Sequence, residues 1–152
     1  MRLEWLPPKQ SRSFSVVYRL SDHALQSVPK PAHGFTSLSI NSVQIEFTEH
    51  GLADYIWGYC PRQSWQATEA EAPGASTGEL RVIPEGRLTP GVSLQDASGP
   101  RPVFYNERTK WLCLGDPLAM SEFRMKFAPG CIAVGSWTEL DALWLRLDRF
   151  EP

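Results

Sequence analysis

The stretch at residues 36–60, TSLSINSVQIEFTEHGLADYIWGYC, predicts a three-stranded antiparallel meander, because its turns and its apolar positions require the same register. A two-residue hairpin loop at residues 41–42 places Leu38 opposite Ile45 and matches apolar with apolar along the first pair of strands. A three-residue loop at residues 49–51 ends on a glycine, which adopts the left-handed conformation that such loops need. Turn chemistry and hydrophobic pattern therefore predict the same meander.

The third strand of this meander carries a row of aromatic residues, Tyr55, Trp57 and Tyr59. If pairing continues unbroken from the three-residue loop, Tyr55 and Trp57 share the apolar side of the ribbon. Glu46 then lies opposite Asp54 on the outer side, where two like charges disfavour each other. This register favours a core role for Tyr55 and Trp57 over a binding platform, and it places Tyr59 at the boundary between core and surface.

Short alternating segments continue along the chain, which 11 glycines and 13 prolines cut into pieces too short for long helices. Besides the meander, strands are expected at residues 14–20, 103–105, 110–114, 122–127, 132–134 and 142–147, with weaker ones at 79–83 and 91–95. Helical turns are expected at residues 21–28 and 116–120, and the tail after residue 147 is expected to fray. About eight to nine short strands are typical of a mainly β, antiparallel, meander-rich sandwich or partly closed barrel.

Two further hairpins have registers that the sequence predicts. A four-residue loop at residues 106–109 places Phe104 opposite Trp111, and the strand that follows is apolar on both faces, as in a covered central strand. A tight return after Ala128 brings Phe127 opposite Ile132. Both pairings match apolar with apolar.

Length and composition predict one globular domain over residues 1–152, with a mobile, exposed loop at residues 67–78, ATEAEAPGASTG. The net charge of −2 disfavours nucleic acid as a partner, because phosphate binding needs an excess of Lys and Arg. No apolar run approaches the roughly 20 residues of a membrane span. With no secretory signal recognised at the start, a cytoplasmic location is expected.

Motifs for catalysis and cofactor binding are missing from the sequence, including G-x-G-x-x-G, the P-loop, G-x-S-x-G and H-E-x-x-H. The three cysteines have no metal-ligand spacing and are interpreted as small buried hydrophobes. His23, His33 and His50 lie beside turn residues and are interpreted as solvated. No metal site, cofactor or catalytic residue is predicted, and the balance is against an enzyme.

Tryptophan is the residue type that points to function, because Trp, Tyr and Arg dominate binding hot spots. Of six tryptophans, Trp5, Trp65 and Trp137 lie in expected loops or at the terminus and are the better candidates for contact, and Trp65 stands just after the aromatic row in the turn CPRQSW. The residues predicted to bind are Tyr59, Arg62, Gln63, Trp65 and Trp137.

Three functions are compatible with these observations. The leading hypothesis is a non-enzymatic cytoplasmic binding protein of the immunity or inhibitory type, whose partner is another protein. The alternative is a β-barrel or sandwich that binds a small molecule or carbohydrate in an aromatic-lined site. The second alternative is an enzyme of unrecognised class that uses turn residues such as His50, Asp54 or Asp116 as acid or base.

Overall fold

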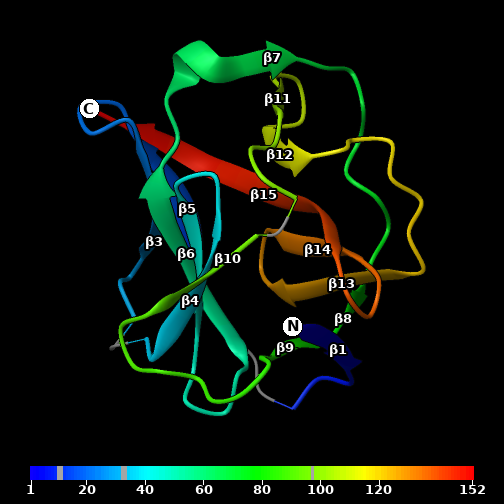
Figure 1. Cartoon of the computed structure of the whole chain (residues 1–152). Helices are drawn as coiled ribbons and strands as arrows, with labels where there is room; N and C mark the ends of the chain where they lie inside the picture. Colours follow the sequence, from blue (N-terminus) through cyan, green and yellow to red (C-terminus); the bar gives the residue numbers. More distant parts are fainter. Residues whose placement is uncertain (10–11, 32–33, 97) are drawn as a thin grey trace.

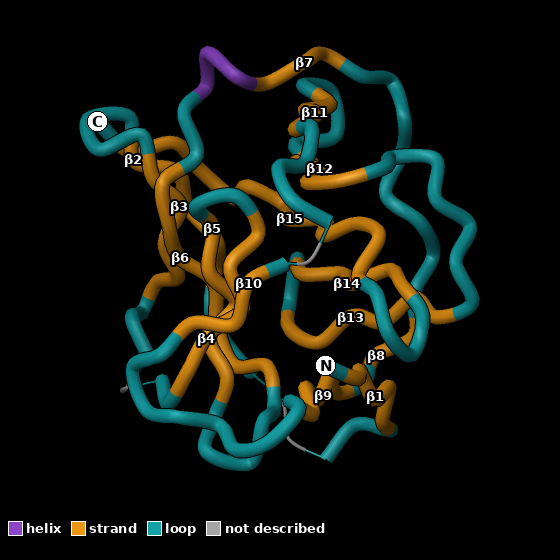
Figure 2. Tube along the Cα trace, viewed as in Figure 1, coloured by secondary structure: helices purple, strands orange, loops and turns teal. Residues whose placement is uncertain are grey.

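The computed structural model describes residues 1–9, 12–31, 34–96 and 98–152, and in these ranges the chain is mainly β (Figures 1 and 2). The strands are β1 (Arg2–Leu6), β2 (Ser15–Arg19), β3 (Ala24–Val28), β4 (Thr36–Ile40), β5 (Val43–Phe47), β6 (Ala53–Tyr59), β7 (Trp65–Ala67), β8 (Ser76–Thr77), β9 (Glu79–Ile83), β10 (Ser93–Gln95), β11 (Val103–Asn106), β12 (Trp111–Gly115), β13 (Phe123–Ala128), β14 (Cys131–Gly135) and β15 (Leu140–Glu151). One short 3-10 helix, η1 (Arg62–Ser64), stands between β6 and β7.

The strands form one large mixed sheet, while β1 and β9 pair as a separate two-stranded ribbon. The order in the large sheet is β10-β4-β5-β6-β3-β2-β15-β12-β11-β7, and β14, β13 and β8 branch from β15. Four pairs are parallel: β10 with β4, β11 with β7, β13 with β8 and β15 with β2. The expectation of antiparallel connectivity throughout is therefore wrong, because each parallel pair joins segments that no single turn connects.

Strand β15 joins the two halves of the sheet, one running from β10 to β2 and the other containing β12, β11, β7, β14, β13 and β8. In Figure 1 it is the long red arrow that crosses between them. Its first part pairs with β12 and β14, and from Leu147 onward it runs parallel to β2. The tail was expected to fray, and that expectation is wrong. Phe150 packs against Tyr18 with ring centroids 5.5 Å apart, so this end of the strand has a tertiary partner.

One hydrophobic core is shared by the two halves of the sheet. Tyr18, Phe47 and Ile56 contribute to it from β2, β5 and β6, and Leu112 and Leu143 contribute from β12 and β15. All five side chains are excluded from solvent. Strand β12 lies between β11 and β15, as its apolar pattern on both faces predicts.

A smaller apolar cluster covers the outer face of β12, β14 and β15. Its buried members are Cys113, Ile132, Val134, Ala142 and Trp144, and Ala70, Ala72 and Ala75 pack against them. The segment expected to be a mobile loop thus begins in β7, ends beyond β8 and lays its alanines on this face. Its mobility stays a prediction.

The three cysteines are free and buried, which confirms their interpretation as small apolar side chains. Burial raises the pKa of the Cys113 thiol from 9.0 to about 12, and it raises the pKa of Cys131 as well. Cys60 also has a raised pKa for the same reason, although the Trp65 indole N–H donates to its sulfur and acts in the opposite direction.

The expected helical turns take other conformations. Residues 24–28 form β3, which pairs with β2 and β6, so tertiary pairing replaces the short helix predicted there. At residues 116–120 the chain makes a turn in which the Leu118 N–H donates to Asp116 Oδ1 over 2.9 Å. Among the described residues, no helix combines the length and the apolar character needed to cross a membrane.

The first hairpin of the meander has the register that the sequence predicts. Leu38 pairs with Ile45 and Ile40 pairs with Val43 across the two-residue loop, in which Asn41 has a φ of 54°. At the second turn, Gly51 has a φ of 79°, as the three-residue loop requires. Local turn chemistry therefore accounts for both ends of β5.

A β-bulge then changes the pairing of β6. Phe47 still pairs with Ala53, but the next pair is Glu46 with Tyr55, so Asp54 is the extra residue. An extra residue moves every later side chain to the other face of the strand. Trp57 and Tyr59 consequently point outward, and the interpretation of Trp57 as core is wrong.

The bulge removes the opposition of two carboxylates that the unbroken register implied. Asp54 leaves the ladder, and its Oδ1 lies 3.3 Å from Nε of Arg12. The same guanidinium reaches the buried Glu79, with 3.7 Å between Nη1 and Oε1. Arg12 therefore pairs with two carboxylates from different strands, and it gives the bulged Asp54 a charged partner outside the ladder.

The other two hairpins also deviate from their predicted registers. In the third, a register shift lies between Lys126 and Ala128, so Ile132 pairs with Lys126 rather than with Phe127. In the second, Asn106 pairs with Trp111, two residues from the predicted register. There the Asn106 side chain accepts hydrogen bonds from the N–H groups of residues 108 and 109, and the four-residue loop lies one position later than predicted, at residues 107–110.

Candidate functional site

Two hollows lie on either side of the turn between β6 and β7. The β6 hollow has a volume of about 440 Å³, and its lining includes Asp22, Gln26, Lys30, Glu46, Trp57 and Tyr59. The β7 hollow has a volume of about 690 Å³, and its lining includes Arg62, Trp65, Glu69, Tyr105, Glu107 and Arg108. The chain passes from one hollow to the other through Cys60 and Pro61.

Two exposed aromatic side chains form one wall of the β6 hollow. Trp57 is 45% exposed and Tyr59 is 53% exposed, on the outer face of β6. The Trp57 indole N–H donates to Oε1 of Glu46 over 2.7 Å, and the Tyr59 ring meets the His23 ring edge-on at 6.4 Å. These contacts orient both rings while leaving much of their carbon surface open to solvent.

The β6 hollow begins where β3 and β6 part. Gln26 opposite Trp57 is the last pair of their ladder. Beyond it, the hydroxyl of Ser27 donates to the carbonyl of Ile56 over 2.8 Å and accepts from the Ile56 N–H over 3.1 Å. A buried side chain thus satisfies the backbone of β6 in place of a strand partner, and the strands can separate without orphaned polar groups.

The outer face continues from the hollow across β5, β4 and β10 as a polar network. The Ser37 hydroxyl donates to Oε1 of Gln44 over 2.8 Å, and Nε2 of Gln44 donates to the Ser39 hydroxyl over 2.5 Å. Ser93 on β10 lies 2.6 Å from Ser37, oxygen to oxygen. These side chains satisfy one another, and the exposed aromatic side chains beside them are Trp57 and Tyr59 of β6.

The β7 hollow is built on a packed aromatic cluster. Trp65 meets Tyr18 edge-on at 4.9 Å and Tyr105 at 5.1 Å, and it donates its indole N–H inward to the sulfur of Cys60 over 3.3 Å. The guanidinium of Arg62 lies 5.9 Å from the Trp65 ring centroid. Trp65 therefore supports the floor of the hollow, while Arg62 is the more exposed group at its edge.

The structure gathers four of the five predicted binding residues and separates the fifth. Tyr59, Arg62, Gln63 and Trp65 surround the turn, with Gln63 exposed on η1. Trp137 follows β14 and lines neither hollow. It contacts Phe123 edge-on at 4.8 Å, and Phe123 in turn stacks on Trp5 at 5.4 Å.

Sequence reasoning missed three residues of the β6 hollow: Gln26, Glu46 and Trp57. The sequence predicts a helical turn at Gln26, which lies in β3, and the unbroken register predicts that Trp57 faces the core, whereas it faces outward. The opposition of Glu46 and Asp54 in the unbroken register was the one signal against that placement, since like charges directly opposite are unfavourable.

The residues considered as acid or base do not gather in one hollow. His50 lines a separate hollow beside β9 whose lining includes neither Asp54 nor Asp116. Asp54 pairs with Arg12. In the part of the chain that the structure describes, no group of three or more His, Cys, Asp or Glu side chains is placed to hold a metal ion, and His33 lies outside that part.

A scan against models of known protein families and a search of curated proteins both find no match to this chain.

Proposed function

We propose that this chain is a non-enzymatic binding protein that recognises a protein partner through the turn at residues 59–65 and the adjoining β7 hollow. One observation carries the proposal: exposed Arg62 lines a hollow of about 690 Å³ together with Trp65 and Arg108, and exposed Tyr59 and Gln63 lie on the turn beside it. Trp, Tyr and Arg beside a concave surface are the usual composition of a binding hot spot. The partner then inserts a side chain into the hollow.

The proposal includes an inhibitory or immunity-type role in the cytoplasm, in which the chain blocks the protein that it binds. It also includes the finer architecture of the sheet as a partly closed barrel. Support for the barrel comes from β15, which pairs with β2 and with β12 and so joins both halves around one core. A rigid barrel suits such a role because its surface is formed before binding, which lowers the entropic cost of association.

Site-specific photo-crosslinking tests the protein-partner proposal. A benzophenone amino acid replaces Gln63 at the turn, and a matched variant carries it at Thr89, another exposed polar residue far along the chain. The captured protein is purified, and its affinity is measured for the Tyr59→Ala and Arg62→Ala variants. We expect capture from position 63 alone and a loss of about tenfold or more in affinity for each variant. Equal capture from both positions, or unchanged affinity, refutes the proposed surface.

A second candidate function is a small-ligand site in the β6 hollow, and a specific observation favours it. The bulge at Asp54 turns Trp57 and Tyr59 outward, beside a hollow of about 440 Å³. This volume lies in the range of sites for small molecules. The two functions share Tyr59 but use different hollows, so Arg62→Ala tests the first function alone and Trp57→Ala tests the second alone.

A further inference from the structure

We propose that the β6 hollow is a binding site for a neutral saccharide, in which Trp57 and Tyr59 stack on the sugar rings. Gln26 and Glu46 form hydrogen bonds with the hydroxyl groups of the sugar. This inference rests on the small-ligand function and is independent of the protein partner. The occupant is a mono- or disaccharide, because the open aromatic surface is limited to two rings on one strand.

The aromatic side chains offer carbon surface in a fixed orientation. Trp57 and Tyr59 are two positions apart on β6, which separates their Cα atoms by about 6.6 Å. The indole N–H of Trp57 is already bonded to Glu46, so the exposed part of that side chain is mainly ring carbon. Sugar rings present C–H groups on their faces, and these pack favourably against the negative face of an aromatic ring.

Polar groups stand beside the rings where the hydroxyls of a stacked sugar would lie. Gln26 is opposite Trp57 in the β3–β6 ladder, and its amide both donates and accepts hydrogen bonds. Glu46 offers carboxylate oxygens, each with more than one lone pair, so the bond from Trp57 leaves capacity for a hydroxyl donor. A purely apolar ligand would leave these groups without partners, which is unfavourable.

The charge of the lining favours a neutral ligand. Two carboxylates, Asp22 and Glu46, and one ammonium group, Lys30, line the β6 hollow. A phosphorylated ligand such as a nucleotide is usually bound by arginine forks and several cations. Here the net charge of the lining is negative, so a phosphate group is repelled and an uncharged sugar is accepted.

The site is also pre-organised on a rigid element. Glu46 fixes Trp57, His23 contacts the edge of Tyr59, and Ser27 holds the backbone of β6 where the strands part. The polar network on β4 and β5 is internally satisfied, so it offers few groups to a longer glycan. We therefore expect affinity to stop increasing beyond two sugar units.

Nuclear magnetic resonance of the full chain tests the inference through the indole N–H signal of Trp57. The probes are maltose, cellobiose, lactose, sucrose, trehalose and N,N′-diacetylchitobiose, with indole and adenosine monophosphate as non-sugar probes. At least one disaccharide is expected to shift the Trp57 signal with saturation. Trp57→Ala and Tyr59→Ala are each expected to weaken binding about tenfold or more, measured by calorimetry.

Trp137→Ala is the matched control, because Trp137 is 47% exposed and lies outside the β6 hollow. Its affinity for the disaccharide is expected to equal that of the unmodified chain. If indole or adenosine monophosphate shifts Trp57 and no disaccharide does, the saccharide inference is refuted and the small-ligand function stands. If no probe shifts the signal, both are refuted. Equal losses in the Trp57 and Trp137 variants also refute the assignment of the site.

Discussion

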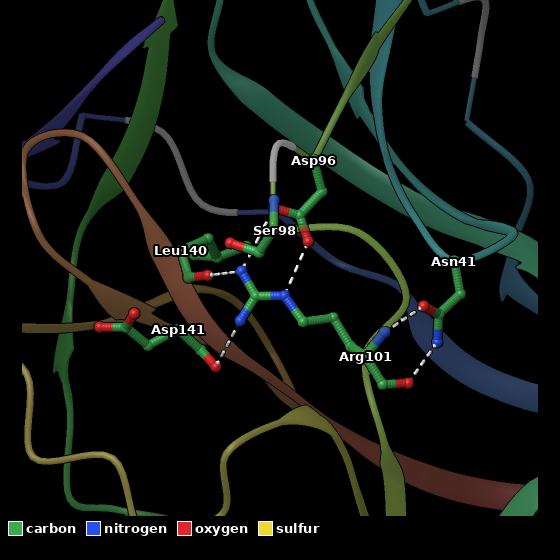
Figure 3. A network of polar contacts seen from close by, with 6 residues as sticks. All are labelled: Asn41, Asp96, Ser98, Arg101, Leu140 and Asp141. Carbon is green, nitrogen blue, oxygen red and sulfur yellow. Dashed lines mark hydrogen bonds and ion pairs between the residues drawn. The ribbon is translucent and has the colours of Figure 1, made fainter.

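Arg101 joins the two halves of the molecule, and its removal is expected to destabilise the fold measurably. Its guanidinium binds Asp96 through two contacts, with 2.7 Å from Nε to Oδ2 and 3.2 Å from Nη2 to Oδ1 (Figure 3). It also donates to the backbone carbonyls of Leu140 and Asp141, where β15 begins. The amide of Asn41 bonds the backbone N–H and C=O of Arg101 over 2.7 and 2.9 Å. One residue therefore connects the β4–β5 turn to β15.

The magnitude follows from what Arg101→Ala leaves behind. Asp96 is 11% exposed, so it would lose its cation without gaining full hydration, and the Leu140 carbonyl would lose a donor. Breaking a buried pair by removing one partner costs about 3–5 kcal/mol. Because 13% of the Arg101 side-chain surface is exposed, we expect a loss of stability at the lower end of this range, about 3 kcal/mol. For a chain of this length, that lowers the melting temperature by about 9 °C.

Two further variants separate charge from geometry. Arg101→Lys keeps the positive charge but not the planar fork, so about half of the loss is expected. Asp96→Ala removes the same ion pair from the other side. In the double variant the losses are expected to be less than additive by about 2 kcal/mol, since neither charge then remains unpaired.

Urea denaturation with linear extrapolation measures each free energy of unfolding, and the slope of the transition checks that all variants unfold alike. A loss below about 1 kcal/mol in Arg101→Ala would show that this residue does not hold the halves together. Additive losses in the double variant would show that Arg101 and Asp96 act separately, against the geometry in Figure 3.

Three other substitutions test the fold at different points. Arg12→Ala is expected to cost about 3 kcal/mol in urea denaturation, because it leaves Glu79, 3% exposed, without a cation, and Arg12→Lys should recover part of that loss. Gly58→Ala is expected to prevent stable folding, since a φ of 140° is strained for alanine and a Cβ would lie 2.2 Å from the Ser42 carbonyl oxygen. Thermal unfolding followed by circular dichroism measures this, and a melting temperature near that of the unmodified chain contradicts it. Because burial raises the pKa of the Cys113 thiol, this thiol loses its proton at a lower pH in the unfolded chain than in the folded chain. Stability should therefore fall as pH rises from 9 toward 12, by up to about 1.4 kcal/mol per pH unit from this thiol, and Cys113→Ala should show a shallower decline between pH 9 and 11. An unchanged slope in that variant would exclude the thiol as the cause.

Sequence reasoning succeeded where the determining interactions are local. The two-residue loop at Asn41 and the glycine of the next turn fix their dihedral angles within a few residues, and both predictions are confirmed. The burial of the cysteines also follows from their apolar neighbours. Turn chemistry and apolar patterning are properties of the segment itself, so they can be derived before the fold is known.

The errors arose where a distant residue decides the local structure. The partner of the bulged Asp54 is Arg12, which lies 42 residues earlier in the chain. The parallel pairing of the tail with β2 brings Phe150 into contact with Tyr18, and this pairing could not be predicted from a turn because no single turn connects the two segments. The candidate binding residues lie in two places for the same reason. Tyr59, Arg62, Gln63 and Trp65 lie together because they are close in sequence, whereas the position of Trp137 depends on tertiary contacts such as that with Phe123.

The inner side of β6 shows what the bulge changes in the packing of this strand. In the unbroken register, Trp57 would stand opposite Val43 and point into the core. The structure puts Gly58 there instead, at a point where even a Cβ atom would lie 2.2 Å from the Ser42 carbonyl oxygen and 2.8 Å from the Val43 Cα. An indole ring cannot occupy that space. The bulge at Asp54 therefore gives the inner position to the one residue type that fits, and the same shift turns the aromatic rings toward solvent.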